Sequence, residues 1–140
     1  MINLINIAEN IIAFVGASNN PEKYGHKVFK DMLAKGYNCI PVNPKETEIL
    51  GQKAYPNLTA AVAGLADKSP GKKPAIDLVD FIVPPAVTLE VLKEVKVLGI
   101  KNVWMQPGSE SPEAIAYCKN NGIDCVHDAC IMLKSDNSKS

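Results

Sequence analysis

The chain has 140 residues, of which 46% are hydrophobic and 21% charged, as expected for one globular domain rather than a disordered or disulfide-stapled chain. Its 15 Lys and Arg residues balance 15 Asp and Glu residues, and this zero net charge argues against a protein that coats nucleic acid or binds membranes through a basic surface. No apolar run reaches the ~20 residues of a membrane helix, and the first residues, MINLINIAENIIAFVG, predict no signal peptide. The four cysteines are expected to be reduced thiols in a cytoplasmic protein.

Short apolar runs alternate with segments of helical period in the first half of the chain. The runs that end at Gly16 and at Asn43 have the length and apolar character of buried strands. Between them, an amphipathic segment stops at Gly36, which is typical of a left-handed helix cap. The predicted elements are a strand over 11–15, a helix over 25–35, a strand over 37–42, and a short helix over 57–65 capped by Asn57 or Thr59.

The second half of the chain repeats this alternation after a polar loop over residues 67–75. Ser111-Pro112-Glu113 has the cap, the first-turn proline and the first-turn acid of a helix start. The predicted elements are a strand over 78–83, a helix over 86–98, a strand over 102–105, a helix from 112 to Gly122, and a strand over 123–126. A short helix over 2–9 and a disordered tail over 134–140 complete the prediction.

The strand–helix–strand rhythm predicts the fold class. It indicates an α/β protein: a single Rossmann-like, doubly wound, mostly parallel five-stranded sheet with helices on both faces. Such sheets bind ligands beyond the carboxyl ends of their strands, where the strand order reverses. The residues that directly follow each strand are therefore the candidate site.

The loop after the first strand favours a phosphate. Gly16 and Ala17 have little or no side chain, Ser18 adds a hydroxyl, and the following helix presents free N–H groups and a positive dipole end. This pattern suits a pyrophosphate, although a tight turn that needs glycine for its backbone angles is the alternative. The loop is not the G-x-G-x-x-G fingerprint, because Pro21 stands at the third glycine position.

The loop after the second strand carries Asn43, Pro44 and Lys45. An NAD site would have an acidic residue here, whereas a lysine attracts a phosphorylated ribose. We therefore expect coenzyme A, with NADP as the second choice, and a solvated surface lysine as the alternative that involves no ligand.

Three further positions near the strand ends have two interpretations each. Pro84 and Pro85 suit a flat apolar contact with an adenine or a pantetheine arm, or else they only end the third strand. Trp104 is expected in the core, with a platform for the ligand as the alternative. Gln106 is either a polar contact to the ligand or a residue that stabilises the turn.

The histidines and cysteines do not form a catalytic or metal-binding pattern. His26 begins the first helix and either donates to a phosphate or is simply exposed, and His127 has no placed partner. The spacing Cys125-x-His127-x-x-Cys130 does not match the common zinc patterns, so no metal is predicted.

Five stretches together resemble a known family. In chain order they are IIAFVGASNNPEKYGHKVFKDM, GYNCIPVNPKETEILGQKAYPNL, IDLVDFIVPP, KNVWMQPGSES and GIDCVHDAC. They resemble the small, single-domain CoA-binding proteins of bacteria and archaea, and are similar to the N-terminal CoA-binding domain of the succinyl-CoA synthetase alpha subunit. The resemblance spans about residues 11–131, and the longer loop around 67–73 departs from the pattern.

The resemblance implies a CoA-binding Rossmann-like domain over residues 1–133. Matching positions, together with Gln106 from the strand-end argument, give the predicted cofactor-binding set: Gly16, Ala17, Ser18, Asn19, Lys23, Tyr24, Asn43, Pro44, Lys45, Ile82, Val83, Pro84 and Gln106. Cys130 is placed where it could form a mixed disulfide with the CoA thiol under oxidation.

The expected function follows from what the resemblance includes and leaves out. The synthetase needs a phosphorylated histidine from a second domain, and no counterpart is recognised here. We therefore expect a protein that binds CoA or an acyl-CoA without catalysing a reaction, as a homodimer or beside a partner enzyme. The alternatives are an NADP-linked oxidoreductase and an interaction module with a vestigial nucleotide pocket.

Overall fold

The computed structural model describes residues 10–68, 71 and 75–134. The helix predicted over residues 2–9 and the tail beyond residue 134 lie outside these ranges. The described elements are β1 (Ile11–Val15), α1 (Tyr24–Ala34), β2 (Asn38–Val42), β3 (Glu48–Ile49), β4 (Gln52–Lys53), α2 (Leu58–Ala66), β5 (Leu78–Phe81), α3 (Pro85–Val97), β6 (Asn102–Met105), α4 (Pro112–Asn120), β7 (Asp124–Val126) and α5 (Ile131–Lys134).

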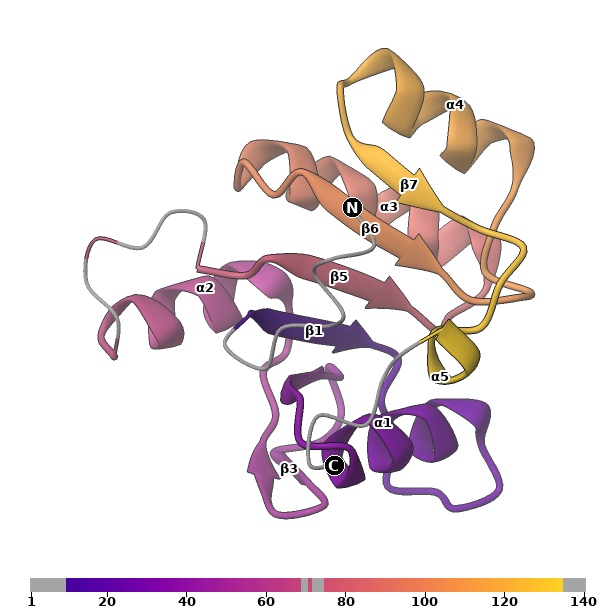
Figure 1. The fold of residues 1–140 in the computed structure, drawn as a ribbon. Coiled ribbons are helices and arrows are strands. Elements are labelled where there is room, and N and C mark those ends of the chain that lie inside the picture. The colour runs from indigo at the N-terminus through magenta and orange to yellow at the C-terminus, as the bar shows by residue number, and fades with distance from the viewer. Residues whose placement is uncertain (1–9, 69–70, 72–74, 135–140) are drawn as a thin grey trace.

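The main sheet has five parallel strands in the order β2-β1-β5-β6-β7 (Figure 1). The chain first adds β2 on one side of β1 and then β5 on the other side. The strand order therefore reverses between β1 and β5, and in open α/β sheets this reversal opens a crevice at the carboxyl ends of the strands. The predicted fold class is confirmed.

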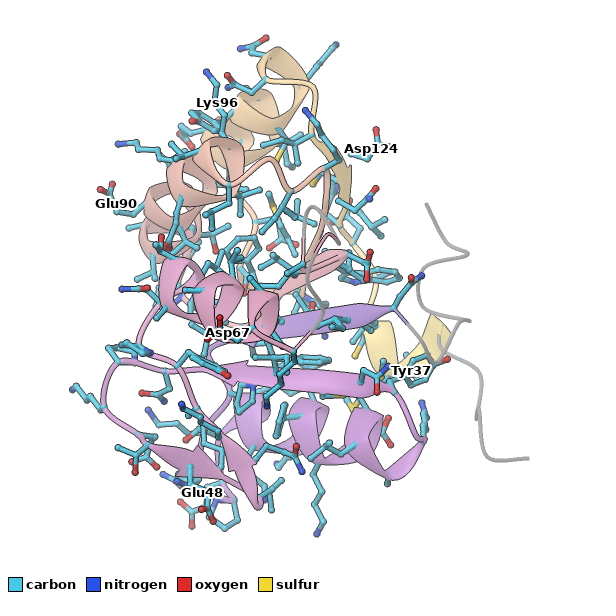
Figure 2. All side chains as sticks on the ribbon, turned by 90° about the vertical axis from the view of Figure 1, so that its left-hand side faces the viewer. Tyr37, Glu48, Asp67, Glu90, Lys96 and Asp124 are labelled. Atoms are coloured by element: carbon cyan, nitrogen blue, oxygen red, sulfur yellow. The ribbon has the colours of Figure 1, made fainter. Side chains whose placement is uncertain are left out.

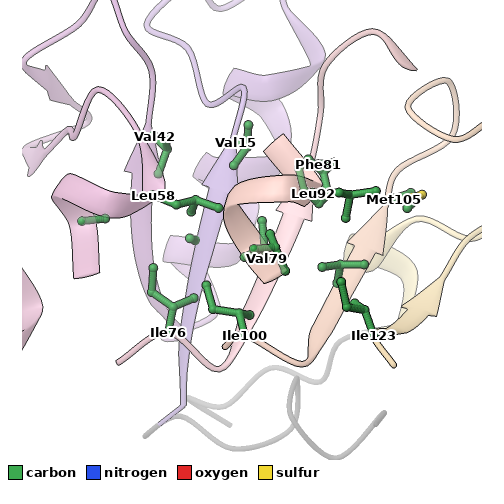
Figure 3. Close-up of a cluster of buried hydrophobic side chains, with 14 of the residues drawn as sticks. Val15, Val42, Leu58, Ile76, Val79, Phe81, Leu92, Ile100, Met105 and Ile123 are labelled. Carbon is green, nitrogen blue, oxygen red and sulfur yellow. The ribbon is translucent and has the colours of Figure 1, made fainter. Parts of the chain in front are cut away.

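Alternate residues of the central strands pack against different helices, as the two-residue repeat of a strand requires. On β1, Ala13 and Val15 pack on the face covered by α2, α3 and α4, whereas Ile12 and Phe14 face α1 and α5. Figure 3 shows the first of these cores, with Leu58 of α2 and Leu92 of α3 in one cluster with Val79 of β5. The three central strands, β1, β5 and β6, are buried on both faces, so they read as continuous apolar runs.

Helix ends follow the sequence signals. Asn57 accepts a hydrogen bond from the backbone of Ala60, and Ser111 accepts one from Ala114, at the starts of α2 and α4. Trp104 is fully buried, as predicted. Glu90 and Lys96 point away from the sheet on α3 (Figure 2). Within the described ranges, no helix is long and apolar enough to cross a membrane.

Three local features differ from the prediction. A two-stranded hairpin, β3–β4, turns through Leu50 and Gly51, both with positive φ. A short helix, α5, follows Cys130. Strand β5 ends at Phe81 rather than at residue 83, and the Val83 N–H donates to Ser109 Oγ instead of to a neighbouring strand.

Candidate functional site

A crevice of about 560 Å³ lies at the carboxyl end of the sheet, where the strand order reverses. Its walls come from the segments that follow β1, β2 and β5, together with the starts of α1, α2 and α3. The lining residues are Val15, Gly16, Ser18, Lys23, Tyr24, Gly25, Val42, Asn43, Pro44, Lys45, Pro56, Asn57, Leu58, Ile82, Val83, Pro84, Val87, Val91 and Glu94.

The crevice gathers most of the predicted site residues. Three of them are exceptions that line no part of it: Ala17, Asn19 and Gln106. Sequence reasoning missed the α2 and α3 side of the crevice. Val87 and Val91 carried a usable signal, because they lie on the apolar stripe of the predicted helix, but that stripe indicated core packing.

Gly16 of the first loop and Gly25 at the start of α1 are both required by the fold. Gly16 has a φ of 108°, and a Cβ there would lie 2.2 Å from the carbonyl oxygen of Ile82. A Cβ on Gly25 would lie 2.0 Å from the carbonyl oxygen of Gly16. Packing alone therefore explains why residue 16 is glycine, and the case for an anion rests on the groups around this loop.

Side chains from three segments hold the loop in place. Asn43 Nδ2 donates to the Ala17 carbonyl at 2.9 Å, and Asn19 Nδ2 donates to the Glu48 carbonyl at 2.8 Å. His26 Nδ1 lies 2.9 Å from the Ser18 carbonyl, which requires the tautomer with the proton on Nδ1. Asn19 and His26 thus have structural partners, and neither is among the residues that line the crevice.

Positive charge and free N–H groups converge on the crevice. No side chain caps the start of α1 within the described chain, in contrast to α2 and α4. The His26 and Lys27 N–H groups donate to the Lys23 carbonyl, so the start of α1 offers an anion the Tyr24 and Gly25 N–H groups and the helix dipole. Lys23 and Lys45 line the same crevice from two loops, are exposed, and make no ion pair with any described residue.

The opposite wall of the crevice is largely apolar. Val83, Pro84 and Val87 form part of it. The lining carboxylate, Glu94, accepts hydrogen bonds from Thr59 N at 2.7 Å and from Thr59 Oγ1 at 2.5 Å. The crevice therefore pairs a cationic side with an apolar side, which suits an amphipathic phosphate ester.

Tyr24 connects the crevice to a buried group of polar residues behind it. Gln106 Nε2 donates to the Tyr24 hydroxyl at 3.3 Å, and Gln106 is completely buried. Burial, and after it the hydrogen bond with Cys130, raises the pKa of Tyr24 to about 12. Tyr24 therefore keeps its hydroxyl proton throughout the neutral range.

The remaining sequence candidates lie away from the crevice. His127 pairs with Asp128 at 2.8 Å, and Cys118 is buried. Within residues 10–68 and 75–134, no three His, Cys, Asp or Glu side chains are grouped as metal ligands would be.

Comparison with known proteins identifies related sequences and folds. The model of a family described as CoA binding domain matches residues 10–136. The Bacillus subtilis protein YneT is 32% identical over 122 residues, which are 87% of this chain and 82% of YneT. The structure of a conserved hypothetical protein from Pyrococcus furiosus is 38% identical, with a TM-score of 0.78, and the match covers 90% of this chain and 99% of that one.

A larger enzyme contains a similar segment. The alpha subunit of ADP-forming acetate–CoA ligase II from Pyrococcus furiosus is 36% identical over 93 residues. The matched segment is 66% of this chain but only 18% of the ligase subunit, so the likeness covers a small part of that protein.

Proposed function

The chain belongs to the CoA-binding domain family, and on that premise we propose that it binds coenzyme A or an acyl-CoA in the crevice between the loops that follow β1, β2 and β5. One observation carries the proposal: two lysines that have no ion pair among the described residues, and the start of α1 with no side-chain cap, converge on one crevice whose opposite wall is apolar. The acetate–CoA ligase relative adds support by its name.

Each part of the crevice suits one part of this ligand. The N–H groups at the start of α1 and Lys23 suit the pyrophosphate, because both stabilise negative charge. Lys45 follows β2, at the position where dinucleotide folds meet the ribose, and suits a ribose phosphate. Pro84 and the valines of α3 suit the adenine or the pantetheine arm.

We propose a binding role without catalytic machinery. No His or Cys is among the described residues that line the crevice, and Glu94 is occupied by Thr59. No nucleophile there has an adjacent base. The protein would then act as a carrier or as a subunit for a partner enzyme.

Lys45→Ala is expected to weaken CoA binding by roughly 5- to 150-fold, the effect of losing one charged hydrogen bond of about 1–3 kcal/mol. Dephospho-CoA lacks the ribose phosphate, so the same substitution is expected to leave its binding almost unchanged. Isothermal titration of both ligands to both proteins at low salt measures this coupling.

Lys101→Ala is the matched control, because it removes an exposed lysine at the amino end of β6, away from the crevice. It is expected to bind both ligands like the wild type. Equal losses for CoA and dephospho-CoA in Lys45→Ala would remove this lysine from the ribose-phosphate contact. Absence of CoA binding, with a fluorescence change on adding NADPH, would support an oxidoreductase instead.

A further inference from the structure

Helices α1 and α5 lie next to each other beside the sheet (Figure 1). A second group of polar side chains comes from α1, β5 and the segments that follow β6 and β7. We name it the thiol cluster: Tyr24, Asp80, Gln106 and Cys130. The Tyr24 hydroxyl and Cys130 Sγ are 2.7 Å apart. Gln106 Nε2 donates to Cys130 Sγ at 3.1 Å, and its Oε1 accepts from the backbone of Ile131 at 3.0 Å. Gln106 thereby holds the thiol at the end of β6.

Asp80 is the feature of this cluster that packing does not explain. It is completely buried in the middle of β5, between Phe14 of β1 and Trp104 of β6. Neither carboxyl oxygen has a hydrogen-bond partner among the described residues. Buried polar groups in folded proteins are nearly always hydrogen-bonded, so a carboxyl without a partner indicates a role beyond stability.

Asp80 lies beside Trp104 in the sheet, and Trp104 Nε1 donates to the carbonyl of Ala129, the residue before Cys130, which brings the carboxyl and the thiol into the same region. Burial, and then the nearby charge of Cys130, raises the pKa of Asp80 well above its usual range. The titratable groups whose charges interact with this carboxyl are Tyr24 of α1, Cys39 of β2 and Cys130. Cys39 is buried, whereas Cys130 is half-buried and borders Tyr24, which lines the crevice.

We propose that Cys130 is a reactive thiol that exchanges with small-molecule disulfides, and that the charge of the buried Asp80 carboxyl slows this exchange when the carboxyl is ionised. The choice of the disulfide of coenzyme A as the preferred partner rests on the proposed function, whereas the reactivity of the thiol does not. Glutathione disulfide has the same chemistry and is the alternative source.

The reaction needs no reagent besides the disulfide. The Cys130 thiolate attacks one sulfur, the disulfide bond breaks, and a new bond forms between Cys130 Sγ and that sulfur. The other half leaves as a thiolate and takes up a proton. Overall, Cys130–SH and RS–SR give Cys130–S–SR and RSH, so the disulfide is the two-electron oxidant and its departing half is reduced.

The test is peptide mapping after the reduced protein is incubated with either disulfide. We expect a mixed disulfide on Cys130 with both reagents, and a rate at least about tenfold higher with coenzyme A disulfide, since prior binding raises the local reagent concentration. Cys130→Ser removes this adduct. Cys125→Ser is the matched control, because it removes another half-buried cysteine that lies outside the cluster. It is expected to leave the adduct on Cys130 unchanged.

The role of Asp80 is tested by the pH dependence of the modification rate, which a purely structural effect of the substitution would not change. In the wild type, the rate of Cys130 modification is expected to change with pH as Asp80 ionises, because a buried negative charge near a thiol disfavours the thiolate. Asp80→Asn is nearly isosteric and removes that charge, so it is expected to react faster than the wild type at pH values where Asp80 is ionised. Equal rates for the wild type and a folded Asp80→Asn protein at every pH would exclude this influence of Asp80.

The two proposals fail in distinguishable ways. CoA titration of Cys130→Ser under reducing conditions measures the crevice alone, and normal affinity there is expected. Normal affinity without any adduct on wild-type Cys130 would overturn the thiol proposal only. Adduct formation at equal rates with both disulfides supports the reactive thiol and rejects coenzyme A as its preferred source.

Discussion

Gly16→Ala is expected to abolish ligand binding and to destabilise the protein by several kcal/mol. The new Cβ would lie 2.2 Å from the Ile82 carbonyl oxygen and 2.9 Å from Val83, so the loop after β5 has to move. That loop lines the crevice, and the displaced atoms are backbone, which no rotamer change relieves. Urea unfolding measures the loss of stability, and titration with CoA measures the loss of binding.

Two other glycines separate the causes of this effect. Gly108 also has a positive φ, of 96°, but a Cβ there meets nothing within 4 Å. Gly108→Ala is therefore expected to cost only the backbone strain of about 1–2 kcal/mol and to bind normally. Gly25→Ala introduces an overlap with the Gly16 carbonyl without a positive φ, and is expected to behave like Gly16→Ala. If Gly16→Ala were no worse than Gly108→Ala, the close approach would not be what requires glycine.

Asp80→Asn is expected to make the free energy of unfolding depend less steeply on pH. The slope is expected to differ from that of the wild type by up to about 1.4 kcal/mol per pH unit. Because burial raises the pKa of Asp80, the folded chain holds this proton more tightly than the unfolded chain does. Below the unfolded pKa of ~3.9 the contribution to stability is fully present. As pH rises from there through the raised pKa of the folded chain, the contribution is lost.

The measurement is the difference in free energy of unfolding between wild type and Asp80→Asn, from urea titrations at several pH values between about 4 and 8. The free energy of unfolding of the variant is expected to rise steadily relative to that of the wild type as pH rises. Other titratable groups contribute equally to both proteins and cancel in the difference. Asp124→Asn removes an exposed carboxylate of β7 and is the control. Parallel pH curves for wild type and Asp80→Asn would show that the buried carboxyl ionises equally easily in both states.

The sheet could be predicted from the sequence because its three central strands, β1, β5 and β6, are buried on both faces. Continuous apolar runs bounded by Gly, Pro and Asn leave little choice of assignment, and the predicted strands and helices begin and end within a few residues of the observed ones. The β3–β4 hairpin was not predicted because its turn uses Leu50 and Gly51, whereas the strong hairpin signals are Asn-Gly and Asp-Gly. The extra two residues assigned to β5 are apolar and β-branched, and they carry no local signal that the Val83 N–H bonds to the Ser109 side chain rather than to a neighbouring strand.

The candidate site could be located only as a set of strand ends. Knowing that a residue follows a strand does not show which way its side chain points, and so Asn19 and Gln106 were grouped with Lys45 although they line no part of the crevice. The Asp80 carboxyl shows a different limit. It lies in the run LVDFIV, where a single acid among apolar residues was a readable signal, but its lack of a partner depends on tertiary packing.

Tyr24 belongs to both the crevice and the thiol cluster, and this shared position couples the two sites. Thermodynamic reciprocity relates the two sites. If a ligand in the crevice changes the equilibrium constant for oxidation of Cys130 by some factor, then oxidation of Cys130 changes the affinity for that ligand by the same factor. A carrier with this property would retain or release its cargo according to the redox state of its surroundings, with one phenol as the intermediary.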